Sequence, residues 1–102
     1  MSLLHTVSKS PFERSNLDSC LKLAMPGSTI LLYEDGVIGA MQGTALAGRI
    51  AEAAKSVKLC ALGPDLAARG LDAAKVVAGV TVVDYADFVD MAEQASAVQA
   101  WC

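Results

Sequence analysis

The sequence predicts an α/β protein, a three-layer α/β/α sandwich whose mainly parallel sheet has four to five strands. Short apolar runs alternate along the chain with longer stretches of helical periodicity, as in strand–helix–strand units. The apolar runs are nearly continuous, which is typical of strands covered on both faces. A length of 102 residues fits one domain, and we expect a single domain over residues 1–102.

The first two strands are predicted at residues 3–7 and 29–33. Between them, Ser10-Pro11-Phe12-Glu13 has the form of a helix start, because its serine can cap, its proline suits the first helical position and its glutamate completes a capping box. Pro26-Gly27 ends that helix. Its apolar residues are spaced by three and four positions, which predicts one buried face: Leu17, Cys20, Leu21 and Ala24.

The region after the second strand begins with Glu34-Asp35-Gly36, which interrupts the apolar run. Gly39 and Gly43 leave two interpretations open, a helix throughout or a loop followed by a helix from about Thr44. Both interpretations place an apolar stripe in the second half, made of Leu46, Ile50, Ala53 and Ala54.

A third strand is predicted at residues 57–62 and a fourth at residues 80–83, again without polar alternation apart from Thr81. Gly63-Pro64-Asp65 closes the third strand. A short helix over residues 65–69 then ends at Gly70, a residue suited to the left-handed conformation.

Residues 71–78 are ambiguous between helix and loop, and residues 97–101 are predicted to form a short final strand. Between them Asp84 caps a last helix whose apolar residues share one face: Tyr85, Phe88, Val89, Ala92 and Ala95. Sites in open parallel sheets form at the carboxyl ends of the strands. A site is therefore expected among the segments that follow the strands: residues 8–10, 34–36, 63–65 and Asp84.

The composition favours a subunit of an oligomer and excludes two classes of partner. Hydrophobic residues make up 54% and charged residues 19%, against roughly 45–50% and 25% in typical domains. Surplus apolar residues on a small domain tend to lie on faces that other subunits cover. The net charge of −3, with scattered basic residues, argues against a nucleic-acid surface. We find neither a spanning stretch of ~20 apolar residues nor a signal peptide, and expect a cytoplasmic protein with no membrane contact.

Specific catalytic motifs are missing from the sequence. It contains no glycine-rich phosphate loop of the common kinds and no nucleophile elbow, so we expect no cofactor. One histidine and three widely spaced cysteines supply neither a metal shell nor a disulfide framework. His5 lies inside a predicted strand and is interpreted as a packed residue.

Two groups of side chains could still carry chemistry. Cys20 in the first helix and Cys60 in the third strand fall at positions that favour packing, and Cys102 at the end has no nearby cation. Asp35 and Asp84 follow strands, so a small-ligand or phosphoacceptor module of flavodoxin-like shape stays open as an alternative. Turn formation and helix capping also explain both aspartates. The residues alone indicate a binding or structural module.

Five segments together resemble the DsrH/TusB family, and they occur in the expected order over almost the whole chain. They are Leu4-His5-Thr6 leading to Lys9-Ser10-Pro11-Phe12, the run from Leu31 to Val37, the run from Ala61 to Gly70, Val83-Asp84-Tyr85-x-x-Phe88-Val89, and Gln99-Ala100-Trp101.

The resemblance implies a subunit of a three-protein sulfur-relay heterohexamer, DsrEFH in sulfur oxidisers or TusBCD in tRNA wobble uridine 2-thiolation. Its partners would be DsrE/TusD-like and DsrF/TusC-like subunits, and persulfide sulfur would pass to a DsrC/TusE-type carrier. In this group the persulfide cysteine belongs to the DsrE/TusD subunit, in the loop after its third strand. The matching segment here, Leu62-Gly63-Pro64-Asp65, has no cysteine. We therefore expect a structural or docking subunit.

Cys20 is the candidate sulfur acceptor. A cysteine at this place in the first helix, with the Ser-Pro-Phe-Glu-Arg helix start, resembles DsrH of sulfur oxidisers more than TusB. This predicts the sulfur-oxidation branch. It also leaves an alternative in which the chain is a sulfurtransferase with Cys20 as an auxiliary persulfide acceptor.

Overall fold

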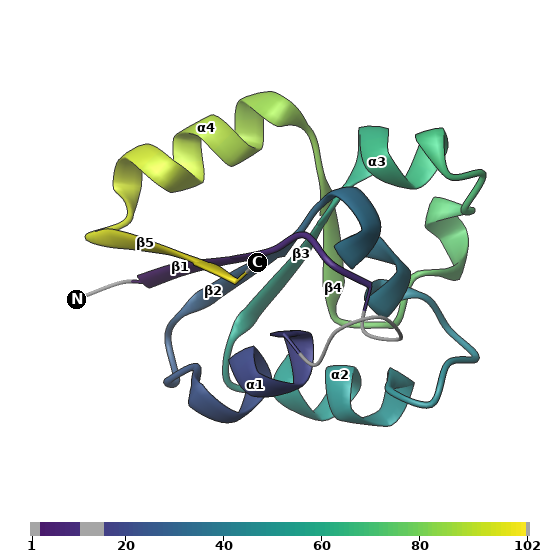
Figure 1. The fold of residues 1–102 in the computed structure, drawn as a ribbon, viewed down its shortest axis with the longest axis horizontal. Coiled ribbons are helices and arrows are strands. Elements are labelled where there is room, and N and C mark those ends of the chain that lie inside the picture. The colour runs from purple at the N-terminus through teal and green to yellow at the C-terminus, as the bar shows by residue number, and fades with distance from the viewer. Residues whose placement is uncertain (1–2, 11–15, 102) are drawn as a thin grey trace.

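A computed structural model describes residues 3–10 and 16–101 of the chain, and its five strands form one parallel sheet (Figure 1). The spatial order is β4-β3-β2-β1-β5. The strands are β1 (Leu3–Val7), β2 (Thr29–Leu32), β3 (Lys58–Leu62), β4 (Val80–Val83) and β5 (Ala97–Trp101). All four strand pairings are parallel. The predicted α/β class and parallel sheet are confirmed.

The helices cover the two faces of this sheet unequally. They are α1 (Asn16–Leu23), the 3-10 helix η1 (Glu34–Ala40), α2 (Ala47–Ala53), α3 (Gly63–Ala68), the short η2 (Ala73–Lys75) and α4 (Tyr85–Gln94). In Figure 1, α1 and α2 lie below the sheet, whereas α4 lies above it. From β1 to β4, each new strand is added on the same side of the one before it. The last strand, β5, is added at the opposite end of the sheet, next to β1. Right-handed crossovers therefore place α4 on the opposite face.

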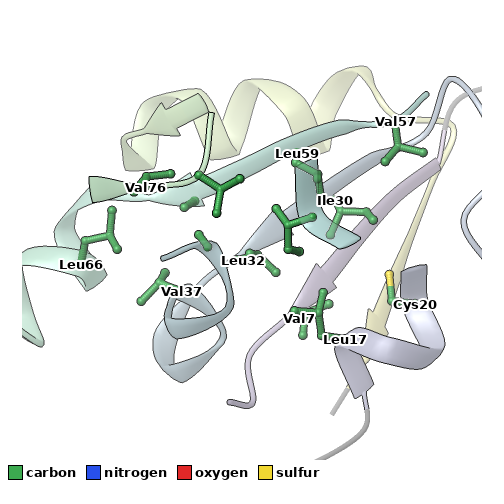
Figure 2. Close-up of a cluster of buried hydrophobic side chains, with 14 residues drawn as sticks. Val7, Leu17, Cys20, Ile30, Leu32, Val37, Val57, Leu59, Leu66 and Val76 are labelled. Carbon is green, nitrogen blue, oxygen red and sulfur yellow. The ribbon is translucent and has the colours of Figure 1, made fainter. Parts of the chain in front are cut away.

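Two clusters of buried side chains follow from this arrangement. The larger one lies between the sheet and the α1, α2 and η1 side and includes Val7, Leu17, Cys20, Ile30 and Ile50 (Figure 2). The smaller one lies beneath α4 and consists of Leu4, Leu31, Cys60, Leu62 and Val83. β2 is the middle strand, and the side chains of Ile30, Leu31 and Leu32 are fully buried on its two faces.

Two expectations about the last strand–helix unit differ from the structure. The fourth strand was predicted to lack polar alternation apart from Thr81, but β4 is an edge strand at which both Thr81 and Val82 are exposed. In addition, only part of the predicted apolar face of the last helix packs against the sheet. Phe88 and Ala92 pack on the smaller cluster, while Tyr85 and Val89 are exposed. One helix is too narrow to cover five strands, so part of its apolar stripe points into solvent.

Several boundaries differ from the sequence interpretation. Pro11, Phe12 and Glu13 of the predicted helix start lie outside the described residues. The region after β2 is a 3-10 helix, and the following α-helix begins only at Ala47. β3 continues directly into α3 at Gly63, so the segment predicted as a loop is the first turn of a helix.

Other predicted positions are confirmed. Gly70 has the left-handed φ of +67°, and Asp84 caps α4 in a reciprocal capping box with Asp87. Over residues 71–78, only Ala73–Lys75 is helical, as one 3-10 turn. Within residues 3–10 and 16–101, no helix has the length and apolar character needed to cross a membrane.

Gly36 is a position where the fold admits no side chain. Its amide donates a hydrogen bond to the carbonyl oxygen of Ser8 at 3.1 Å. A Cβ atom at this position would overlap the carbonyl oxygen of Val7. The backbone at the start of η1 therefore packs directly against the backbone at the end of β1.

Replacing Gly36 by alanine should lower the free energy of unfolding by about 1–3 kcal/mol, because the new methyl group would push η1 away from β1. The matched control is Gly48→Ala in α2, where a Cβ would meet nothing within 4 Å. That substitution should raise the free energy of unfolding by up to about 1 kcal/mol through helix propensity. Urea denaturation of both variants is the measurement, and equal effects would contradict the packing at Gly36.

Candidate functional site

The carboxyl edge of the sheet brings together two of the segments in which a site was expected. The backbone amide of Glu34 donates to the carboxylate of Asp65 at 2.6 Å, although the residues are 31 positions apart. The Arg69 Nε donates to the Asp35 carboxylate at 2.9 Å, and the same guanidinium donates to the Asp65 carbonyl oxygen at 3.3 Å. The ends of β2 and β3 are thus linked by one arginine and two aspartates.

This edge cluster, made of Glu34, Asp35, Asp65 and Arg69, stabilises an unusual backbone. Glu34 has a left-handed φ of +49°, a conformation that costs a non-glycine residue of order 1 kcal/mol. The hydrogen bond from its amide to Asp65 offsets part of that cost. The cluster contains three carboxylates, one cation and no thiol, hydroxyl or imidazole. It is therefore an acidic edge in which any nucleophile would be a carboxylate.

The two aspartates of the phosphoacceptor alternative have structural partners. Asp35 is paired with Arg69, and the Asp84 carboxylate accepts a hydrogen bond from the Asp87 amide at 2.8 Å. Asp84 lies at the start of α4 and belongs to a different part of the edge. Turn formation and capping therefore account for both side chains. No cluster of three His, Cys, Asp or Glu suited to a metal ion occurs within the described part of the chain.

Cys20, the candidate sulfur acceptor, is fully buried. Its side chain points from α1 towards the sheet, beside Leu17 in the larger cluster (Figure 2). Burial raises the pKa of the Cys20 thiol to about 12. Since the thiolate is the nucleophile in sulfur transfer, a protonated thiol without access cannot take up sulfur in this arrangement.

Cys60 is equally enclosed on the other face of the sheet. It lies in β3 beneath α4, with its Sγ 4.0 Å from the Sδ of Met91. Burial raises the pKa of the Cys60 thiol, the charge of Lys58 lowers it and that of Asp87 raises it. Cys102 lies outside the described residues. Neither thiol within residues 3–10 and 16–101 is placed to react.

His5 and Trp101 form a contact that the sequence interpretation missed. The Trp101 Nε1 donates to the His5 Nδ1 at 3.1 Å, which links β5 to β1 across 96 positions. Because Nδ1 accepts, the neutral imidazole carries its proton on Nε2, and that buried atom has no hydrogen-bond partner among residues 3–10 and 16–101. Burial lowers the pKa of His5. Both residues lie in segments that resemble the DsrH/TusB family. That resemblance was the signal in the sequence from which a role for them could have been inferred.

The surface of α4 was also missed as a candidate interface. Tyr85 and Val89 are 57% and 54% exposed. A shallow groove of about 280 Å³ beside them is lined by Phe88, Val89, Ala92 and Glu93. We call these five residues the α4 surface. Val98 of β5 is 52% exposed and pairs with Leu4 of the smaller cluster, so it lies on the same face of the sheet.

Comparison with known proteins gives one family. The family model described as DsrH like protein matches residues 9–98. Protein TusB of Erwinia tasmaniensis is 39% identical over 99 residues, which is 97% of this chain and all of that protein. The TusB proteins of Sodalis glossinidius and Shigella flexneri are 35% and 33% identical with the same coverage.

Solved structures share the fold. The ychN protein from E. coli superposes with a TM-score of 0.83 at 16% identity, over 98% of this chain and 99% of that one. MTH1491 from Methanobacterium thermoautotrophicum, titled a protein of unknown function, gives a TM-score of 0.73 at 18% identity, over 96% and 97% of the chains. At these identities the likeness concerns the fold alone.

The burial of His5 predicts a pH-dependent stability. Below about pH 6.5 the histidine of the unfolded chain takes up a proton, whereas burial keeps the folded imidazole neutral to lower pH. The unfolded state then binds more protons, so the free energy of unfolding should fall as the pH drops below about 6.5.

Urea denaturation at pH 7.5 and 5.5 measures this effect. The control is His5→Asn, whose amide oxygen can still accept from Trp101 but does not titrate. The wild-type chain should lose more stability on acidification than the variant. An identical loss in both chains would show that His5 is not the group responsible.

Proposed function

This chain belongs to the DsrH/TusB family, and on that premise we propose that it is a docking subunit of a sulfur-relay complex. The family match over residues 9–98 carries the proposal. The complex would be a heterohexamer with DsrE/TusD-like and DsrF/TusC-like subunits in the cytoplasm. The chain would act in it as one domain, shaping the assembly without bearing the persulfide itself.

The chemistry of sulfur relay supports a docking role. A persulfide forms and is passed on when a thiolate attacks a sulfane sulfur, which requires an accessible and ionised cysteine. Cys20 and Cys60 are fully buried, and burial raises the pKa of each thiol. At the start of α3, where the persulfide cysteine of a DsrE/TusD subunit is expected, this chain has Gly63-Pro64-Asp65. The reacting thiol would then belong to another subunit.

The names of the relatives favour the thiolation branch over the sulfur-oxidation branch. The curated relatives described above are TusB proteins whose matches cover 97% of this chain. The preference for sulfur oxidation rested on Cys20 and on the helix start at residues 10–14, and the burial of Cys20 weakens its first reason. In the proposed role, sulfur passes to a TusE-type carrier for tRNA wobble uridine 2-thiolation. Transfer to a DsrC-type carrier in sulfur oxidation is the alternative.

Co-expression tests the proposed assembly. The chain, produced with the DsrE/TusD-like and DsrF/TusC-like proteins of its own genome, should elute with both as one complex of hexameric mass. Size-exclusion chromatography with light scattering is the measurement, and each pair of proteins without the third is the control. A stable monomer in the presence of both proteins would contradict the proposal.

A sulfur-uptake assay tests the alternative in which Cys20 is an auxiliary acceptor. The isolated chain carrying Cys102→Ser, incubated with a persulfide donor, should gain no mass of about 32 Da, because its remaining thiols are enclosed and protonated. Intact mass spectrometry is the measurement. An adduct that forms readily and disappears on adding Cys20→Ser would establish the sulfurtransferase alternative.

A further inference from the structure

We propose that the α4 surface is the docking site for a partner subunit that presents apolar side chains flanked by lysine or arginine. The inference rests on the proposed function, because it names the surface by which this chain joins its complex. Two observations carry it: incomplete apolar cover on this face of the sheet, and an excess of negative charge on α4.

Within the part of the chain that the structure describes, α4 is the one helix on its face of the sheet, so the apolar cover there is incomplete. Phe88 and Ala92 pack against the sheet, but their side chains are only partly buried. Tyr85 and Val89 are exposed, Val89 lines the groove on α4, and Val98 is exposed on the edge strand β5. A parallel sheet is normally covered on both faces. A helix or strand edge placed along α4 would complete this layer.

The charge of α4 indicates which kind of partner would bind there. Four acidic residues and no lysine or arginine occur after Lys75 in the sequence, namely Asp84, Asp87, Asp90 and Glu93. Lys58 of β3 lines a second groove with Asp87 and Asp90, so one cation faces this acidic helix from the sheet. The helix keeps a net negative charge, and a partner with basic residues around its apolar contact complements it.

The same charge disfavours a second copy of this chain as the occupant. A two-fold interface would use the same patch on both chains. It would bring the three carboxylates of one α4 (Asp87, Asp90 and Glu93) close to those of the other, with no lysine or arginine in either helix. Like charges brought together across an interface are unfavourable.

The other exposed apolar pair provides a matched control. Leu23 at the end of α1 and Met25 just after it are 66% and 68% exposed, more than Tyr85 or Val89. They follow Lys22, which shares the carboxylate of Asp18 with Arg49, so this second patch has no excess of negative charge. Substitution at this second patch tests whether any exposed apolar residue would behave in the same way.

The experiment is a calorimetric titration of the full chain into the co-purified complex of the two partner subunits. Val89→Asp should weaken binding about tenfold or more, as for a residue central to an interface. Asp90→Lys combined with Glu93→Lys should weaken binding at low salt and much less at 0.5 M salt (a condition of the assay), because screening shortens the reach of exposed charges to roughly 4 Å. Leu23→Asp should stay within about twofold of wild type.

Three results would overturn the inference, and they are distinguishable. If Val89→Asp binds the intact partner complex with unchanged affinity, the α4 surface is not the docking site, and the proposed function is unaffected. A wild-type chain that binds neither subunit overturns the proposed function and the assigned surface together. A dimer of the isolated chain in sedimentation, abolished by Val89→Asp, would assign the surface to a second copy. Circular dichroism confirms that each variant is folded.

Discussion

A sheet of five parallel strands has two apolar faces, and the main features of this chain follow from how unevenly it covers them. The crossovers from β1 to β4 all place their helices on one face, where α1, α2 and η1 enclose the larger cluster. Among the described helices, α4 alone lies across the other face. The closer cover on the first side buries Cys20. Incomplete cover on the second leaves Tyr85 and Val89 in solvent.

The same constraint connects the fold to the proposed role. A relay thiol has to be open to a donor and an acceptor, but both described cysteines fill space inside the two clusters. At the carboxyl edge, β3 passes straight into α3, and Asp65 accepts a hydrogen bond from the amide of Glu34. The edge at which related subunits are expected to bear their cysteine carries here a network of ion pairs and hydrogen bonds. Interaction with other subunits would then use the exposed surface of the chain. Helix α4, which combines exposed apolar side chains with a net negative charge, is the most distinctive part of that surface.

Local patterns were sufficient to predict the strands and the cap of the last helix. Continuous apolar runs identified the sheet, Asp84 was recognised as a cap, and the burial of Cys20 followed from its place on an apolar stripe. Contacts between distant residues carry no such signal, as with the hydrogen bond between Trp101 and His5 or that between Glu34 and Asp65. Periodicity also reveals an apolar stripe without revealing what covers it. The exposure of half the α4 stripe depends on the order of the strands, which the sequence does not state.

The most direct measurement is the rate of sulfur transfer from the reconstituted complex to its carrier protein when this chain contains no cysteine. Cys20→Ala, Cys60→Ala and Cys102→Ser remove all three thiols, and light scattering verifies that the complex still assembles. A docking subunit predicts the same transfer rate as the wild-type complex. A rate that falls to the level of the complex without this chain, with assembly intact, would show that one of its thiols carries sulfur and would contradict the docking role.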